Sequence, residues 1–106
     1  MIPVFETSDR EGIAEVVNDI LARHRDGSLT DISARRALNA YTTSFAPDDF
    51  LDEADLMGFD VYLDITLQIS KRTTSSWDAE LADRTDLIAG IALGEDTARA
   101  KIREVA

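Results

Sequence analysis

The sequence predicts an all-α fold: a compact single-domain bundle of about five to six helices around a central apolar helix, Phe59–Ile69. Three observations carry this prediction. Apolar residues recur at helical spacing, and pairs typical of helix N-termini precede several of these runs. The chain has 106 residues, 44% of them hydrophobic, which is enough for one core and too little for two. We therefore assign residues 1–106 to a single domain.

The central stretch fits two periodicities. Every odd position from Phe59 to Ile69 is apolar, which is the alternation of a half-buried strand. On a helix, however, Asp60, Asp64 and Gln68 align as a narrow polar stripe, and the remaining sides are apolar. A strand here would have only the short Ile2–Phe5 as a partner, and an isolated pair of strands is marginally stable. We therefore expect a nearly buried helix.

The first two helices begin at capping pairs. Ser8 and Glu11 form a capping box before a run with one apolar face, namely Ile13, Val16, Val17, Ile20 and Leu21. This helix is expected to end near His24–Arg25, with Gly27 free to adopt a left-handed cap. The second helix is expected to start around Ser28–Asp31 and to bury Ile32, Ala37, Leu38 and Tyr41.

The third predicted helix is strongly acidic. It begins at Ala46-Pro47, and Asp48 and Asp49 then face the positive end of the helix dipole. One face carries Phe50, Leu51, Ala54 and Met57. The other face carries five carboxylates around one apolar residue: Asp48, Asp49, Asp52, Glu53, Asp55 and Leu56. Gly58 is expected to separate this helix from the central one.

Two helices are predicted after the central one. Ser75 and Asp78 form a capping pair, and the helix that follows groups Trp77, Leu81, Thr85, Ile88, Ile91 and Ala92 on one side. Gly94 ends this helix. A short terminal helix then places Ala98, Ile102 and Val105 together.

Negative charge is concentrated in one part of the chain. The formal net charge is −10, and from residue 37 to 70 there are seven acids and no lysine or arginine. Such a surface repels nucleic acid and attracts basic proteins. Solubility, or salt tolerance, is the alternative explanation of the acidity. A helix-turn-helix reading of the first two helices, with Arg35 and Arg36 on the outer face, conflicts with this charge because DNA affinity depends on phosphate neutralisation.

Catalytic and metal-binding motifs are absent from the sequence. There is no cysteine. His24, the one histidine, is expected to interact with the negative end of the dipole of the first helix, which is a structural role and not that of a metal ligand. Residues 53–64 resemble a calcium loop only in Gly58, because Met57 replaces an oxygen ligand. Asp60 and Asp64 read better as a solvated stripe than as a metal site. We expect no enzyme, no metal, no cofactor and, without a signal peptide or an apolar span, a cytoplasmic protein.

In size, acidity and helical content the chain resembles the small acidic helical anti-CRISPR proteins of phages. The resemblance implies an inhibitor that presents a phosphate-mimicking face to a basic nucleic-acid-binding protein, such as a CRISPR effector subunit or nuclease. Residues three or four apart on a helix lie about 5–6 Å from each other, comparable to successive phosphates. The expected partner-binding residues are Asp48, Asp49, Asp52, Glu53, Asp55, Leu56 and Asp60. A toxin-neutralising immunity protein or antitoxin is the alternative, and an oligomeric assembly protein is the third; we expect a monomer.

Overall fold

Five α-helices make up the computed structural model, which describes residues 2–72 and 78–105 and the side chains of residues 10–72 and 79–104. They are α1 (Ile2–Arg25), α2 (Asp31–Phe45), α3 (Glu53–Lys71), α4 (Asp78–Ala92) and α5 (Asp96–Val105). No strand occurs in these ranges. The radius of gyration is 13.3 Å, as expected for one domain of this length. The predicted all-α single-domain bundle is thus confirmed.

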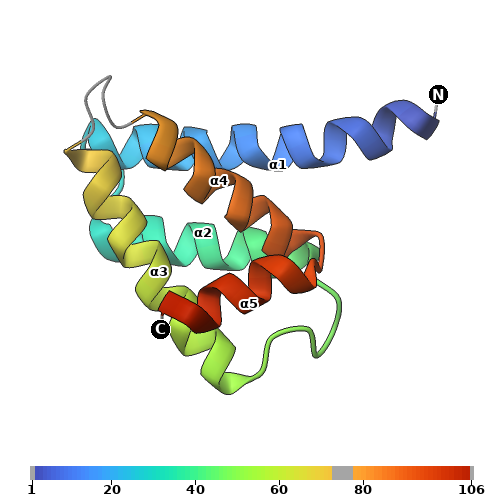
Figure 1. Ribbon diagram of the computed structural model, residues 1–106. Helices are drawn as coiled ribbons and strands as arrows, with labels where there is room; N and C mark the ends of the chain where they lie inside the picture. Colours follow the sequence, from blue (N-terminus) through green and yellow to red (C-terminus); the bar gives the residue numbers. More distant parts are fainter. Residues whose placement is uncertain (1, 73–77, 106) are drawn as a thin grey trace.

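α3 packs against each of the other four helices, as does α4. In Figure 1 α3 runs along one side of the bundle. Phe59, Leu63 and Leu67 are fully buried on its inner side. Around them pack Val17 and Leu21 of α1 and core residues of α2, α4 and α5, which include Ala34, Leu38, Leu81, Ile88, Ile91 and Ile102. α1 is the longest helix, and its N-terminal end projects beyond the others (Figure 1).

The predicted start of the first helix and the predicted cap of the second need correction. α1 begins at Ile2, so Ser8 and Glu11 lie inside the helix. Among the helical residues that precede Ser8, only Pro3 is a proline. The first turn of a helix tolerates proline because its N–H groups have no helical partner. α2 is capped by Thr30, whose Oγ1 accepts from the Ser33 N–H at 3.1 Å, and not by Ser28.

The predicted core of the second helix is only partly right. Leu38 is fully buried, as expected, and Tyr41 is partly buried. Ile32, however, is exposed, and Ala34 and Thr42 take its place in the core. Ala34, Leu38 and Thr42 recur at four-residue intervals on one side of α2, whereas Ile32, two residues before Ala34, lies on the other side. Thr42 satisfies its buried hydroxyl by donating to the Leu38 carbonyl at 2.7 Å.

The third and fourth predicted helices are one. α3 runs through Gly58 without a break, because a single glycine costs a helix only about 1 kcal/mol and the packing around the buried Gly58 outweighs it. Its start lies at Glu53, so Asp48 and Asp49 belong to the preceding loop. The expectation that the Phe59–Ile69 stretch is buried nearly all round is wrong. Val61 and Ile65 are exposed.

The C-terminal half follows the predicted pattern. Leu81, Thr85, Ile88, Ile91 and Ala92 of α4 are all buried, as are Ala98 and Ile102 of α5. Gly94, at φ 72°, makes the left-handed turn between these helices. The predicted cap at Ser75 and the packing of Trp77 lie outside the described residues, and so do the side chains of Asp78 and Val105.

Candidate protein-binding surface

The acidic segment enters α3 through a reciprocal cap. Asp52 is the N-cap residue: its Oδ1 accepts from the Asp55 N–H at 2.8 Å, and Asp55 Oδ2 accepts from the Asp52 N–H at 3.2 Å. Both side chains thereby satisfy N–H groups that the first turn of a helix leaves without partners. Asp52 and Asp55, which the sequence analysis assigned to partner binding, therefore cap the N-terminus of α3.

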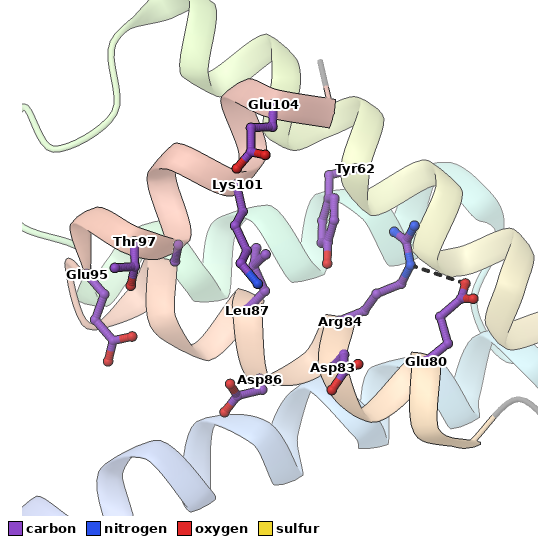
Figure 2. A pocket seen from close by; sticks show the side chains of 11 residues that line it. Tyr62, Glu80, Asp83, Arg84, Asp86, Leu87, Glu95, Thr97, Lys101 and Glu104 are labelled. Carbon is purple, nitrogen blue, oxygen red and sulfur yellow. Dashed lines mark ion pairs between the residues drawn. The ribbon is translucent and has the colours of Figure 1, made fainter.

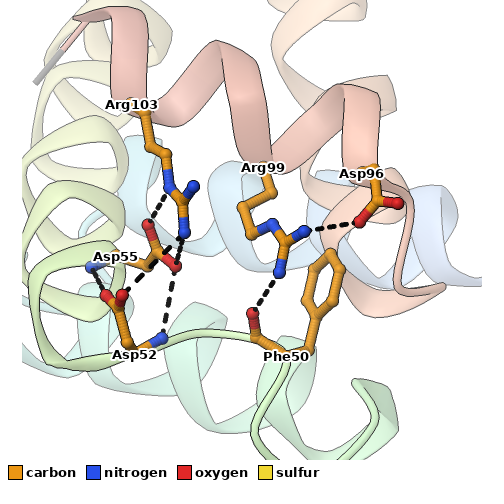
Figure 3. A network of polar contacts seen from close by, with 6 residues as sticks. All are labelled: Phe50, Asp52, Asp55, Asp96, Arg99 and Arg103. Carbon is orange, nitrogen blue, oxygen red and sulfur yellow. Dashed lines mark hydrogen bonds and ion pairs between the residues drawn. The ribbon is translucent and has the colours of Figure 1, made fainter.

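Asp55 is not available to a partner, contrary to the sequence prediction. Only 3% of its surface is exposed. Arg103 of α5 donates to both of its oxygens, from Nε to Oδ1 at 2.7 Å and from Nη2 to Oδ2 at 3.0 Å (Figure 3). This bidentate pair holds the pKa of Asp55 below its ordinary value. Helical spacing placed Asp55 on the outer face, but α5 covers it.

α5 also contacts the 46–52 loop, which carries Asp48 and Asp49. Arg99 donates from Nη1 to the Phe50 carbonyl at 3.0 Å, and its guanidinium lies 4.8 Å from the centre of the Phe50 ring (Figure 3). Arg99 Nη2 donates to Asp96 at 2.6 Å. No local sequence pattern indicates that α5 contacts the 46–52 loop. The one available indication was that Arg99 and Arg103 are four residues apart and so share a helix face.

The other predicted residues stay at the surface. Asp48, Asp49 and Glu53 are exposed and have no hydrogen-bond or ion-pair partner among the described residues. Leu56 is exposed as well. Asp60 is partly buried and accepts from Asn39 Nδ2 at 2.9 Å. The structure thus keeps three free carboxylates at the N-terminal end of α3 and removes Asp55 from the set.

An apolar stripe continues from these carboxylates along α3. Met57, Val61 and Ile65 are 71%, 52% and 42% exposed. Their i, i+4, i+8 spacing puts them in one row on the helix. One side of this row faces α2, where Asp64 pairs with Arg35 at 3.3 Å. We call Glu53, Met57, Val61 and Ile65, together with the loop acids Asp48 and Asp49, the outer face of α3.

Sequence reasoning missed the apolar half of this face. It assigned Met57 to the buried side of a short helix, and Val61 and Ile65 to a helix covered all round. In the structure α2 flanks one side of α3, α4 and α5 flank another, and no described element covers the third. The available signal was the excess of apolar residues over what one helix can bury in a small bundle.

The one histidine has a structural position. His24 is buried, and its Nε2 lies 2.5 Å from Oδ1 of Asp31, so it joins the end of α1 to the start of α2. The hydrogen bond from His24 lowers the pKa of Asp31. In the described part of the chain no group of three His, Cys, Asp or Glu side chains could hold a metal ion. Among the same residues, no helix is long and apolar enough to cross a membrane.

No protein-family model, curated protein or solved structure matches the chain. Its function must therefore be inferred from its own residues.

Proposed function

We propose that the chain is a non-enzymatic inhibitor that binds a basic, nucleic-acid-binding protein through the outer face of α3, in the manner of an anti-CRISPR. The observation that carries the proposal is the row Met57, Val61 and Ile65, which is exposed on α3 in line with the free carboxylate of Glu53. The proposal places the protein in the cytoplasm, with its partner.

The apolar row supplies a reason for binding that acidity alone does not. Burying a methionine, a valine and an isoleucine that are half exposed stabilises a complex through the hydrophobic effect. Protein interfaces commonly place such residues at the centre, inside a polar rim that excludes water. Glu53, Asp60 and Asp64 supply one side of that rim.

The carboxylates determine which kind of partner fits. Residues 37–70 contain no lysine or arginine. The cations that reach this segment come from other helices: Arg103 pairs with Asp55 at the start of α3, and Arg35 meets Asp64 further along. Asp48, Asp49 and Glu53 have no intramolecular cation and can pair with lysines and arginines of a partner. A protein that binds a nucleic-acid backbone presents such cations in a row.

A pull-down with matched variants tests the proposal. The bait is the intact chain, exposed to a lysate of a host with a CRISPR system, and bound proteins are identified by mass spectrometry. We expect a CRISPR effector subunit or nuclease that elutes steeply as salt rises. Capture of a toxin instead would establish the antitoxin alternative.

Two variants and one control make the test specific. Asp48→Lys with Glu53→Lys reverses charge on the outer face and leaves the Asp52 cap intact, and Val61→Ser removes the centre of the apolar row. Glu11→Lys with Glu15→Lys makes the same change of charge on exposed residues of α1. We expect both outer-face variants to lose the partner and the α1 variant to keep it. Equal losses in both charge variants would show that only net charge matters, and full binding by the Asp48, Glu53 variant would refute the proposal.

A further inference from the structure

The outer face of α3 has opposite charges at its two ends. Glu53 lies one turn before Met57, and its carboxylate is exposed without a cation among the described residues. Arg72 follows the last turn of the helix, seven residues after Ile65 and therefore on the same side. Its Nε donates to the Gln68 carbonyl at 3.3 Å, and its terminal nitrogens have no partner in the described part of the chain. The face therefore runs from an acid, through the apolar row, to a base.

This order of charges makes the face complementary to a second copy of itself. In an antiparallel pair of α3 helices with Val61 on the two-fold axis, Met57 of each copy lies opposite Ile65 of the other, because both are four residues from Val61. A parallel pair would instead place Glu53 against Glu53 and Arg72 against Arg72. The charges thus favour the antiparallel arrangement.

The antiparallel arrangement also brings acid and base together at both ends. Glu53 lies eight residues before Val61 and Arg72 lies eleven residues after it, which leaves an offset of about 4.5 Å along the helix axis. Helical side chains tilt toward the N-terminus of their own helix, so Glu53 of one copy and Arg72 of the other extend toward each other and close this offset. The two-fold axis makes the ion pair occur twice in each dimer.

The position of α3 gives a second copy access to this face. α3 runs along one side of the bundle (Figure 1), and no described element covers Met57, Val61 or Ile65. The groove between α4 and α5 is a contrasting surface (Figure 2). It is lined by five carboxylates, namely Glu80, Asp83, Asp86, Glu95 and Glu104. Two copies that met there would bring like charges together, so self-association is expected at α3.

We propose that the free protein forms an antiparallel homodimer through the outer face of α3, with Val61 on the two-fold axis and a Glu53–Arg72 ion pair at each end. A contact made by one helix is smaller than the roughly 800 Å² per partner of a standard interface, so the dimer should be weak and the monomer expected from the sequence should prevail in dilute solution. The dimer does not rest on the proposed inhibitory function. It occupies the same surface, so a basic partner and a second copy exclude each other.

Analytical ultracentrifugation of the purified chain between about 1 µM and 1 mM tests the dimer without any partner. We expect the weight-average mass to rise toward that of two chains. Val61→Ser should weaken the dimer about ten-fold or more, because the residue meets its own copy and each dimer loses two apolar side chains. A chain that stays monomeric throughout this range would overturn the proposal and leave the proposed function standing. Unchanged association of Val61→Ser would overturn it too.

Salt separates the dimer from binding to a basic partner. Each copy has a net charge of −10, so about 0.5 M NaCl screens the repulsion between the copies and does not weaken the apolar contact. The dimer should therefore persist at a salt concentration that releases a basic partner. Dissociation of the dimer by this salt would contradict an interface centred on the apolar row.

Charge reversal at the two ends gives the sharpest test. Glu53→Arg and Arg72→Glu should each weaken the homodimer about three- to ten-fold, because each variant places like charges at both ends. An equimolar mixture of the two should form a heterodimer within about two-fold of the parent, since each reversed side chain then meets its opposite. Glu11→Arg on α1 and Lys101→Glu on α5 make the same charge changes at exposed positions and serve as controls. Equal weakening by the controls, or a mixture no tighter than its components, would overturn the proposal.

Cysteine crosslinking tests the orientation without these charge variants. The chain has no cysteine of its own. A short bismaleimide should link Val61→Cys to itself, and should link Met57→Cys to Ile65→Cys faster than it links either variant to itself. Far-UV circular dichroism of each variant checks that the helices are intact. Faster self-linking of Met57→Cys would show a parallel pair and overturn the antiparallel dimer.

Discussion

The inner and outer sides of α3 have similar residues and different surroundings. Phe59, Leu63 and Leu67 face the bundle and are fully buried, while Met57, Val61 and Ile65 recur at the same spacing and are between 42% and 71% exposed. Apolar character therefore does not determine burial here; the positions of α2, α4 and α5 do. The outer side retains apolar surface that the fold itself does not need, which is the pattern of a binding surface.

The two carboxylates at the start of α3 show the same contrast in charge. Asp55 is enclosed by the cap and by Arg103, whereas Glu53, two residues before it, is exposed without a cation. The first stabilises the fold, and the second is free for a partner. The following predictions test this division between inner and outer residues.

Truncation on the two sides should give the largest difference. Leu63→Ala removes a fully buried side chain and should lower the free energy of unfolding by about 2–5 kcal/mol. Ile65→Ala removes a side chain that is already 42% exposed and should cost about 1 kcal/mol or less. Urea denaturation followed by far-UV circular dichroism measures both. Equal losses would mean that the outer side is covered and that the division does not hold.

Asp55→Asn should destabilise the protein by about 1–3 kcal/mol at neutral pH, because it weakens a buried charge-assisted hydrogen bond. The pKa of Asp55 is lowered by folding, so its stabilisation is present above the ordinary aspartate pKa of about 3.9 and is lost as the pH falls through the lowered value. The gap between the unfolding free energies of parent and variant should therefore narrow as the pH falls below the ordinary aspartate pKa of about 3.9.

Denaturation midpoints at several pH values measure this gap, and the exposed Glu53→Gln serves as the control. Its unfolding midpoint should stay close to that of the parent throughout. A constant Asp55→Asn deficit at every pH would show that the loss comes from packing and not from the ion pair.

Gly94→Ala tests how firmly the acidic loop is attached. Gly94 has φ 72°, and a Cβ there would lie 2.9 Å from Cδ and Cγ of the rigid Pro47 ring. The strain should cost about 1–2 kcal/mol, measured as a lower thermal midpoint. Gly12→Ala, in the interior of α1 with no atom within 4 Å of the new Cβ, should instead stabilise the protein slightly. A neutral Gly94→Ala would mean that the loop moves freely against the bundle.

Leu56→Ala should have the smallest effect on folding. Leu56 is exposed, so its loss should change the free energy of unfolding by about 1 kcal/mol or less. If Leu56 anchors a partner, the same substitution should weaken binding without lowering the midpoint. A lower midpoint with unchanged affinity would assign Leu56 to internal packing.

Local sequence patterns were enough to predict the fold class and most of the buried residues on the inner sides of the helices. Helical periodicity identified Ile13, Val17 and Leu21, and also Leu81, Ile88 and Ile102, all of which are buried. Such periodicity is a local property, because a helix repeats its faces whatever lies next to it. It also located the acidic segment and the carboxylates Asp48, Asp49 and Glu53 that remain exposed.

Which residues of the acidic segment remain free depends on contacts between helices. Helix boundaries at Asp52 and through Gly58 depend on competition between caps and packing, which local patterns do not resolve. The burial of Asp55 depends on Arg103, 48 residues later, and the exposure of Val61 and Ile65 depends on where α2, α4 and α5 leave α3 uncovered. These are long-range contacts, so the pattern of one helix cannot encode them.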